Sequence, residues 1–122
     1  MDYFDYYLDA FRKFADFSGR ATRSQYWFFV LFNFIISLVL GFIDSIFGLY
    51  SDGMGFLSAI YGLVVLIPAL ALSVRRLHDT NRSGWWLLVL FIPIVGIFVF
   101  LYFMIQDSTP GANRYGPNPK GF

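Results

Sequence analysis

Three long apolar segments constrain the fold of this chain more than any other feature. They cover roughly residues 26–47, 55–74 and 85–105, and Asp44 is the only charged side chain within them. About 20 mostly apolar residues let a helix cross a bilayer, and none of the three shows the polar face that a surface helix of a soluble protein presents every 3.6 residues. Only 14% of all residues are charged, against about 25% in soluble domains. The sequence predicts an all-α fold, a polytopic membrane protein with three transmembrane helices in one domain.

Residues 1–17 are predicted to form an amphipathic helix that lies along the membrane surface. On a helical wheel six apolar side chains share one face, opposite the charged ones: Phe4, Tyr7, Leu8, Phe11, Phe14 and Ala15. The polar face carries four acids and two bases, so burial of the rings, and not attraction to anionic lipid, would hold this helix. It either packs over the cytoplasmic ends of the other helices or docks another protein. These acids also argue against a cleaved signal peptide.

Basic residues predict the orientation in the membrane. Four of them precede the first apolar segment, three lie between the second and the third, and none lies between the first and the second. Because basic loops remain in the cytoplasm, we expect the N-terminus and residues 75–82 to be cytoplasmic. The Pro- and Gly-rich tail, residues 106–122, carries the remaining two, Arg114 and Lys120.

The third apolar segment has two alternative courses because it contains Pro93 and Gly96, which favour a break in the helix. A kinked single span would place the tail outside. A re-entrant hairpin would bring all nine basic residues to the cytoplasmic side, with legs that each reach about half the bilayer. Irregular backbone at that depth must be buried in protein or line a cavity. The kinked single span leaves less irregular backbone within the membrane, so it is the preferred prediction.

A polar stretch separates the second and third apolar segments, and it holds the best candidate site. Five arginines are expected to converge on the cytoplasmic surface: Arg20, Arg23, Arg75, Arg76 and Arg82. Guanidinium groups bind phosphate in bidentate fashion, so this set is a candidate site for an anion or a lipid headgroup. The simpler interpretation, which the sequence favours, is a capped turn, in which Arg75 and Arg76 snorkel at the helix end and Asp79 pairs with an arginine or caps the next helix with Thr80.

Metal, catalytic and nucleic-acid sites find no support in the sequence. His78 is the only histidine and there is no cysteine, whereas a catalytic zinc ion needs three protein ligands. His78 and Asp79 would point about 100° apart on a helix, and no nucleophile has a positioned base. We therefore expect no enzyme activity and no cofactor. The few basic residues lie at a membrane surface, so nucleic-acid binding is not expected either.

Three blocks of sequence carry a resemblance to a known family. They are FSGRATRSQYW (17–27), VRRLHDTNRSGWW (74–86) and GANRYGPNPKG (111–121). In this order, separated by apolar segments, they resemble the YhaH-like family of small bacterial inner-membrane proteins, known as domain of unknown function 805. The resemblance implies an integral protein of the bacterial cytoplasmic membrane and implies no reaction. It also marks a set of motif residues: His78, Asp79, Trp85, Trp86, Asn113 and Tyr115. Because the tail is one of the blocks, the resemblance favours a tail packed on the helices over a disordered one.

Two classes of function remain. The first is a non-catalytic membrane protein whose arginine-rich cytoplasmic face binds lipid headgroups or a protein partner, with homo-oligomers as an open alternative. The second is a small oligomeric transporter or channel subunit. Transport paths are lined by polar groups within the spans, and these spans offer few of them, so the first class is preferred. Asn33 is expected to form an interhelical hydrogen bond, and Asp44 to reach the outer interface.

Overall fold

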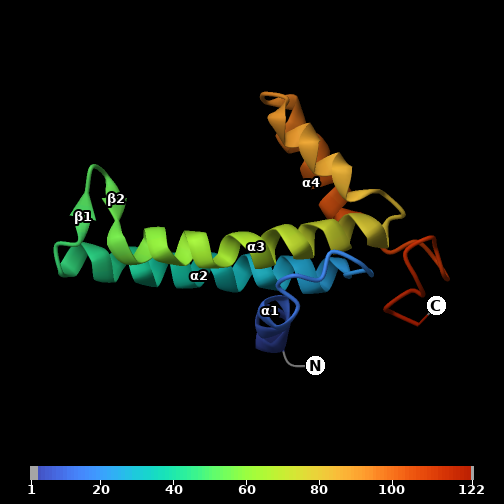
Figure 1. Cartoon of the computed structure of the whole chain (residues 1–122), viewed down its shortest axis with the longest axis horizontal. Coiled ribbons are helices and arrows are strands. Elements are labelled where there is room, and N and C mark those ends of the chain that lie inside the picture. Colours follow the sequence, from blue (N-terminus) through green and yellow to red (C-terminus); the bar gives the residue numbers. More distant parts are fainter. Residues whose placement is uncertain (1–2, 122) are drawn as a thin grey trace.

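The computed structural model describes residues 3–121, and helices dominate it. The elements in chain order are α1 (Tyr3–Arg12), α2 (Arg23–Ile46), β1 (Tyr50–Ser51), β2 (Met54–Gly55), α3 (Phe56–Asp79), the 3₁₀ helix η1 (Gly84–Phe91) and α4 (Val95–Ile105). Figure 1 shows α2 and α3 side by side along the long axis, with α1 seen almost end-on beside α2 and with η1 and α4 projecting from one end. The predicted all-α architecture of a polytopic membrane protein is confirmed.

Helices α2 and α3 form an antiparallel pair long enough to cross a bilayer. Each has 24 residues, or about 36 Å of helix, and both are apolar enough to span a membrane. A capping box starts α2, because the Thr22 hydroxyl accepts the Gln25 amide N–H and the Gln25 side chain accepts that of Thr22. The short β1–β2 hairpin joins the two helices through Asp52 and Gly53, both with positive φ, as a tight hairpin turn requires.

Asp44 has a structural role that the sequence did not reveal. We expected its side chain to reach the interface, but it is fully buried. Its carboxylate accepts the amide N–H groups of Leu57 (2.9 Å) and Ser58 (3.0 Å), so it caps the start of α3 from the neighbouring helix. A Cβ on Gly55 would lie 2.1 Å from the carboxylate, so only glycine lets the two meet.

The predicted N-terminal amphipathic helix is present as α1, which packs on α2. Stacked rings join Tyr3 to Phe28 (4.4 Å between centroids) and Tyr7 to Phe29 (5.5 Å). The helix ends at Arg12, before the predicted end at residue 17, and residues 1 and 2 of the predicted range lie outside the described residues. Its apolar face therefore serves, at least in part, to join α1 to the helix pair.

A chain of polar side chains links α1, α2 and α3. The Tyr7 and Tyr61 hydroxyl oxygens are 2.7 Å apart, and Tyr61 donates to Asn33 Oδ1 at 2.7 Å. This confirms the interhelical hydrogen bond predicted for Asn33. The three groups satisfy one another, which removes the penalty for placing them among apolar helices.

The third apolar segment is not one kinked helix, so the preferred prediction for residues 85–105 is wrong. The chain reverses after η1, and α4 returns beside it, as Figure 1 shows. The Trp86 ring contacts the Phe103 ring (5.4 Å between centroids), and a Cβ on Gly96 would lie 1.9 Å from the Val89 carbonyl oxygen. The reversal is a tight turn at Ile94, whose φ is +66°. The segment folds as a hairpin, which is the shape of the alternative prediction.

The tip of this hairpin bonds much of its own backbone, which the sequence argument did not count. Amide N–H groups around the turn donate to carbonyl groups within it: Ile92 to Val89, Val95 to Pro93 and Gly96 to Ile92. Pro93 has no N–H to satisfy. These local bonds lower the penalty for irregular backbone at membrane depth, which had favoured the kinked span.

Candidate functional site

Asp79, the last residue of α3, is the centre of a buried polar cluster. Its carboxylate accepts hydrogen bonds from Arg20 Nε (2.9 Å), Arg76 Nη1 (3.1 Å) and the Ser108 hydroxyl. The side chains of Asp79, Arg20 and Arg76 are at most 1% exposed. We call these four residues the Asp79 hub. It joins the segment before α2, the end of α3 and the C-terminal tail at one end of the helix pair.

Arg20 uses all five of its N–H donors within the chain. Beyond Asp79 Oδ1, its guanidinium donates to four backbone carbonyl oxygens: Asp79 (3.2 Å), Thr109 (2.8 Å), Gly111 (2.9 Å) and Gly116 (3.1 Å). Because a guanidinium has five donors in a fixed planar arrangement, no donor remains for a ligand. Arg20 therefore fastens the tail to α3.

Arg75 and Arg76 bind the ends of other helices. Arg75 Nη1 donates to the carbonyl oxygens of Lys13 (3.1 Å) and Asp16 (2.7 Å), just after α1. Arg76 donates to the carbonyl oxygens of Met104 (3.3 Å) and Gln106, at the end of α4. The last carbonyls of a helix lack intrahelical partners and carry partial negative charge. Arg76 thus caps α4, and Arg75 fastens the turn that follows α1 to the end of α3.

The imidazole ring of His78 helps to hold the C-terminal tail against the end of α3. The imidazole is stacked on Tyr115 with centroids 3.8 Å apart and planes 3° apart, and its Nδ1 lies 2.9 Å from the Gly19 carbonyl oxygen. Asn113 Nδ2 donates to the His78 carbonyl oxygen (2.9 Å), and Arg114 donates to the Asn81 carbonyl oxygen (3.2 Å). The prediction of a tail packed on the helices is confirmed.

Arg23 and Arg82 keep part of their surface open. Arg23 lies 3.6 Å from Asp107 and its side chain is 47% exposed. Arg82 donates to Gln106 Oε1 (2.7 Å) and lies over the Phe103 ring, 4.2 Å from its centre. The five arginines named from the sequence all lie at the same end of the α2–α3 pair. The side chains of Arg20, Arg75 and Arg76 are buried, whereas Arg23 and Arg82 keep exposed surface beside their contacts, so the candidate anion site narrows to Arg23 and Arg82.

Asp107 sits between two cations at the surface of the tail. Its carboxylate accepts a hydrogen bond from the Lys120 ammonium group and one from the Ser108 amide N–H, and these bonds hold its pKa below the usual range of an aspartate. Asp107 is therefore ionised at neutral pH and offsets part of the positive charge of Arg23 and Lys120.

Comparison with known proteins places the chain in a family. The model of DUF805, described as a protein of unknown function, matches residues 14–117. This chain is a member of the DUF805 family. It is 45% identical over 117 residues to "Inner membrane protein YhaH" of Escherichia coli K12, which covers 95% of this chain and 97% of the relative. It is 44% identical over 115 residues to "Inner membrane protein YhaI" of the same organism, covering 94% and 95%. No solved structure matches.

The region that matches DUF805 contains the whole Asp79 hub but not α1, which ends at Arg12. Sequence reasoning missed two contributors to this region, Ser108 and Thr109. Both follow the third apolar segment directly. A kinked span would have carried them to the other side of the membrane, so only the hairpin could have indicated that they meet Asp79.

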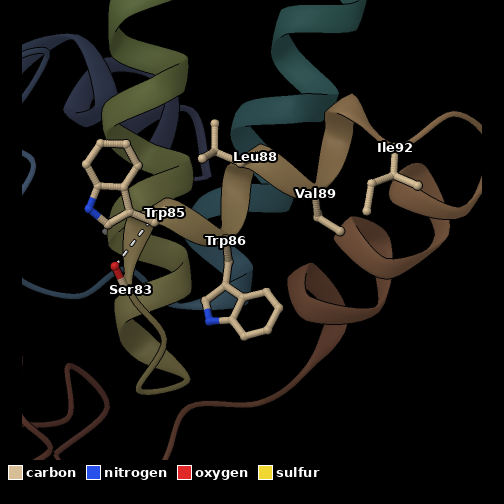
Figure 2. A pocket seen from close by; sticks show the side chains of 6 residues that line it. All are labelled: Ser83, Trp85, Trp86, Leu88, Val89 and Ile92. Atoms are coloured by element: carbon tan, nitrogen blue, oxygen red, sulfur yellow. Dashed lines mark hydrogen bonds between the residues drawn. The ribbon is translucent and has the colours of Figure 1, made fainter.

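Apolar hollows surround the start of η1. One of about 420 Å³ runs along η1 and is lined by Ser83, Trp85, Trp86, Leu88, Val89 and Ile92. Figure 2 shows that the two tryptophan side chains leave η1 in different directions, Trp85 toward α3 and Trp86 toward α4. Ser83 caps η1 by accepting the Trp85 amide N–H (3.3 Å). Trp85 is 78% exposed and stands where the polar stretch enters the apolar hairpin.

Proposed function

We propose that this protein is a non-catalytic component of the bacterial inner membrane whose cytoplasmic end binds anionic phospholipid headgroups. Both relatives are inner membrane proteins by name, which supports the location. The basic residues support an orientation with the N-terminus in the cytoplasm. Because the hairpin returns the chain to its starting side, this orientation places the tail in the cytoplasm as well.

The proposal rests on one observation, the gathering of all nine basic residues at one end of the α2–α3 pair. Arg75 reaches the backbone of Lys13, Arg23 reaches the Ile105 carbonyl oxygen (3.3 Å), and Arg114 reaches Asn81. Residues 24–74, which include the opposite end, contain no lysine or arginine. A basic cluster beside an anionic leaflet attracts it by about 1 kcal/mol for each lysine or arginine near the surface.

Six of these basic residues are exposed or half-buried and so can meet headgroups: Arg12, Lys13, Arg23, Arg82, Arg114 and Lys120. The other three act inside the fold. Arg20, Arg75 and Arg76 hold the tail, α1 and α4 in place, so they support the surface without contributing to binding.

The polar residues that chemistry or transport would need have structural roles. Asp79 bonds two arginines, and the His78 ring is stacked on Tyr115. Asn33 and Tyr61 bond each other. Because these side chains are engaged within the protein, they support a non-catalytic role. The transporter or channel alternative stays a prediction that no particular contact favours.

The test removes surface charge. In the triple variant Arg23→Gln, Arg82→Gln and Arg114→Gln, we expect the ratio of phosphatidylglycerol to phosphatidylethanolamine among co-purified lipids to fall. If each arginine contributes ~1 kcal/mol, the ratio should fall about fivefold for each arginine removed. Mass spectrometry of the lipids bound to protein in mild detergent measures this ratio. The matched triple-lysine variant keeps the charges and should retain the enrichment. Equal enrichment in the glutamine variant and the unmodified protein would overturn the proposal.

A further inference from the structure

A hollow of about 500 Å³ lies beside the polar stretch, and its lining is unusual for a surface that faces lipid. It is lined by Phe17, Val74, His78, Ser83, Gly84 and Trp85. His78 is only 7% exposed, and it lines this hollow. A nearly buried imidazole and a serine hydroxyl thus stand among apolar walls.

The His78 ring has an unused acceptor. Because a carbonyl oxygen only accepts, the 2.9 Å contact with Gly19 makes Nδ1 the donor, and in the neutral ring Nε2 then carries the free lone pair. Nε2 has no hydrogen-bond partner in residues 3–121. In the same residues, every fully buried polar side-chain atom does have a partner. Nε2 must therefore lie at the small exposed edge of the ring, where it can accept a hydrogen bond from a ligand.

A second hollow continues the first toward the membrane interior. It is about 370 Å³ in volume, shares Gly84 and Trp85 with the first, and is otherwise lined by leucines and Phe91. Leu70, on its α3 side, precedes Asp79 by nine residues, which is about 14 Å of helix. A Cβ on Gly84 would lie 2.9 Å from Val74 Cγ1, so this glycine lets η1 approach α3 and form the shared wall.

The charge around the polar hollow selects among headgroups. Nε2 needs a hydrogen-bond donor, which a hydroxyl or an ammonium group could supply. The Arg114 guanidinium lies over Tyr115, 5.1 Å from the ring centre, on the ring that stacks on His78. This cation repels an ammonium group and attracts a phosphate, so a hydroxyl-bearing anionic headgroup fits best.

We infer that the two hollows form a specific site for one phosphatidylglycerol molecule of the cytoplasmic leaflet. This inference rests on the proposed function and adds a defined site to it. The glycerol hydroxyl of the headgroup donates to His78 Nε2, the Ser83 hydroxyl faces the phosphate, and one acyl chain lies between α3 and η1 against Leu70. The site changes from polar in the first hollow to apolar in the second, in the same order as a phospholipid does from headgroup to acyl chain.

The test fills the apolar hollow without removing charge. Leu70 is 41% exposed and faces the hollow, so Leu70→Trp should displace the acyl chain and reduce the phosphatidylglycerol retained by the purified full-length protein about tenfold, or ~1.4 kcal/mol. Native mass spectrometry after addition of dioleoyl-phosphatidylglycerol counts the lipids that stay bound. The matched control is Leu38→Trp on α2, where the leucine is 59% exposed and lines neither hollow; this variant should retain the lipid.

A second variant tests the headgroup. In His78→Asn the side-chain amide can still donate to Gly19, but the Nε2 acceptor is lost, so we expect the preference for dioleoyl-phosphatidylglycerol over dioleoyl-phosphatidylethanolamine to disappear. Normal retention in Leu70→Trp, or an unchanged preference in His78→Asn, would overturn the specific site. If charge removal at the surface abolishes the enrichment while Leu70→Trp has no effect, the specific site is wrong and the proposed function stands. If the unmodified protein shows no preference for the anionic lipid, the proposed function itself fails.

Discussion

Arg20 and Arg23 are three residues apart and carry the same group, yet the fold uses them in opposite ways. The Arg20 side chain is 1% exposed and all five of its N–H donors are used within the chain, whereas that of Arg23 is 47% exposed, donates to the Ile105 carbonyl oxygen and lies 3.6 Å from the Asp107 carboxylate. The difference follows from position: Arg20 precedes α2 and reaches the carbonyl groups of the tail, while Arg23 opens the first turn of α2. Arg20 therefore contributes the geometry of its donors, and Arg23 contributes its charge.

This contrast predicts that replacement by lysine destabilises the protein more at Arg20 than at Arg23. Arg20→Lys keeps the charge but removes the planar set of donors, leaving buried carbonyls and Asp79 partly unsatisfied, and should lower the free energy of unfolding by about 3 kcal/mol. Arg23→Lys, the matched surface change, should lower it by about 0.5 kcal/mol or less. Thermal unfolding in detergent, followed by circular dichroism, measures both. Similar losses for the two variants would contradict the role assigned to Arg20.

Among the elements, the η1–α4 hairpin depends on a single strained residue. Ile94 has φ +66° and ψ −62°, a conformation that is rare and unfavourable for a β-branched side chain. Ile92, on the other side of Pro93, has an ordinary extended backbone with φ −84°. The chain reverses at Ile94 because the returning α4 packs against η1, which stabilises the turn beyond its local preference.

Substitution by glycine should therefore change the thermal stability in opposite directions at Ile94 and Ile92. Ile94→Gly relieves a backbone strain of about 1 to 3 kcal/mol, which exceeds the entropy lost by adding a glycine, so the thermal midpoint should rise. Ile92→Gly has no strain to relieve and should lower the midpoint. Thermal unfolding of the two variants in one detergent gives the comparison. Were residues 85–105 a single helix, both glycines would destabilise it.

At the scale of the whole molecule, the hairpin gives the protein two unlike ends. One end holds the tail, the Asp79 hub and all nine basic residues. The other holds the β1–β2 hairpin and the buried Asp44. In a membrane this asymmetry favours a single orientation, with the N-terminal segment and the tail on the same side.

Cysteine labelling tests this arrangement. Ala112, an exposed residue of the tail, and Ser51, an exposed residue of β1, should report opposite sides. An impermeant thiol reagent added to intact cells, with the outer membrane permeabilised, should label Ser51→Cys and spare Ala112→Cys, and should label both once the inner membrane is opened. The chain has no other cysteine. Labelling of Ala112→Cys in intact cells would place the tail outside and contradict the hairpin.

The sequence by itself determined the class of protein and its helical elements. Apolar length, helical period and the position of charges are local properties, so they predicted α2, α3 and the amphipathic α1. They also predicted that the arginines gather at one end, because all five lie near helix ends on the same side of the apolar segments. Asn33 was assigned its interhelical bond for a related reason, since an amide within an apolar helix needs a partner.

Only the tertiary structure decided how the third segment runs and what each arginine binds. Arg20 meets Asp79 across 59 positions of sequence and Gly116 across 96, and no local pattern encodes such contacts. The direction of the segment after Pro93 likewise depends on α4 packing against η1, because the turn residue is strained by itself. Asp44 shows the same limit, since a carboxylate near a helix end can reach solvent or cap a neighbouring helix, and only the position of α3 selects the second.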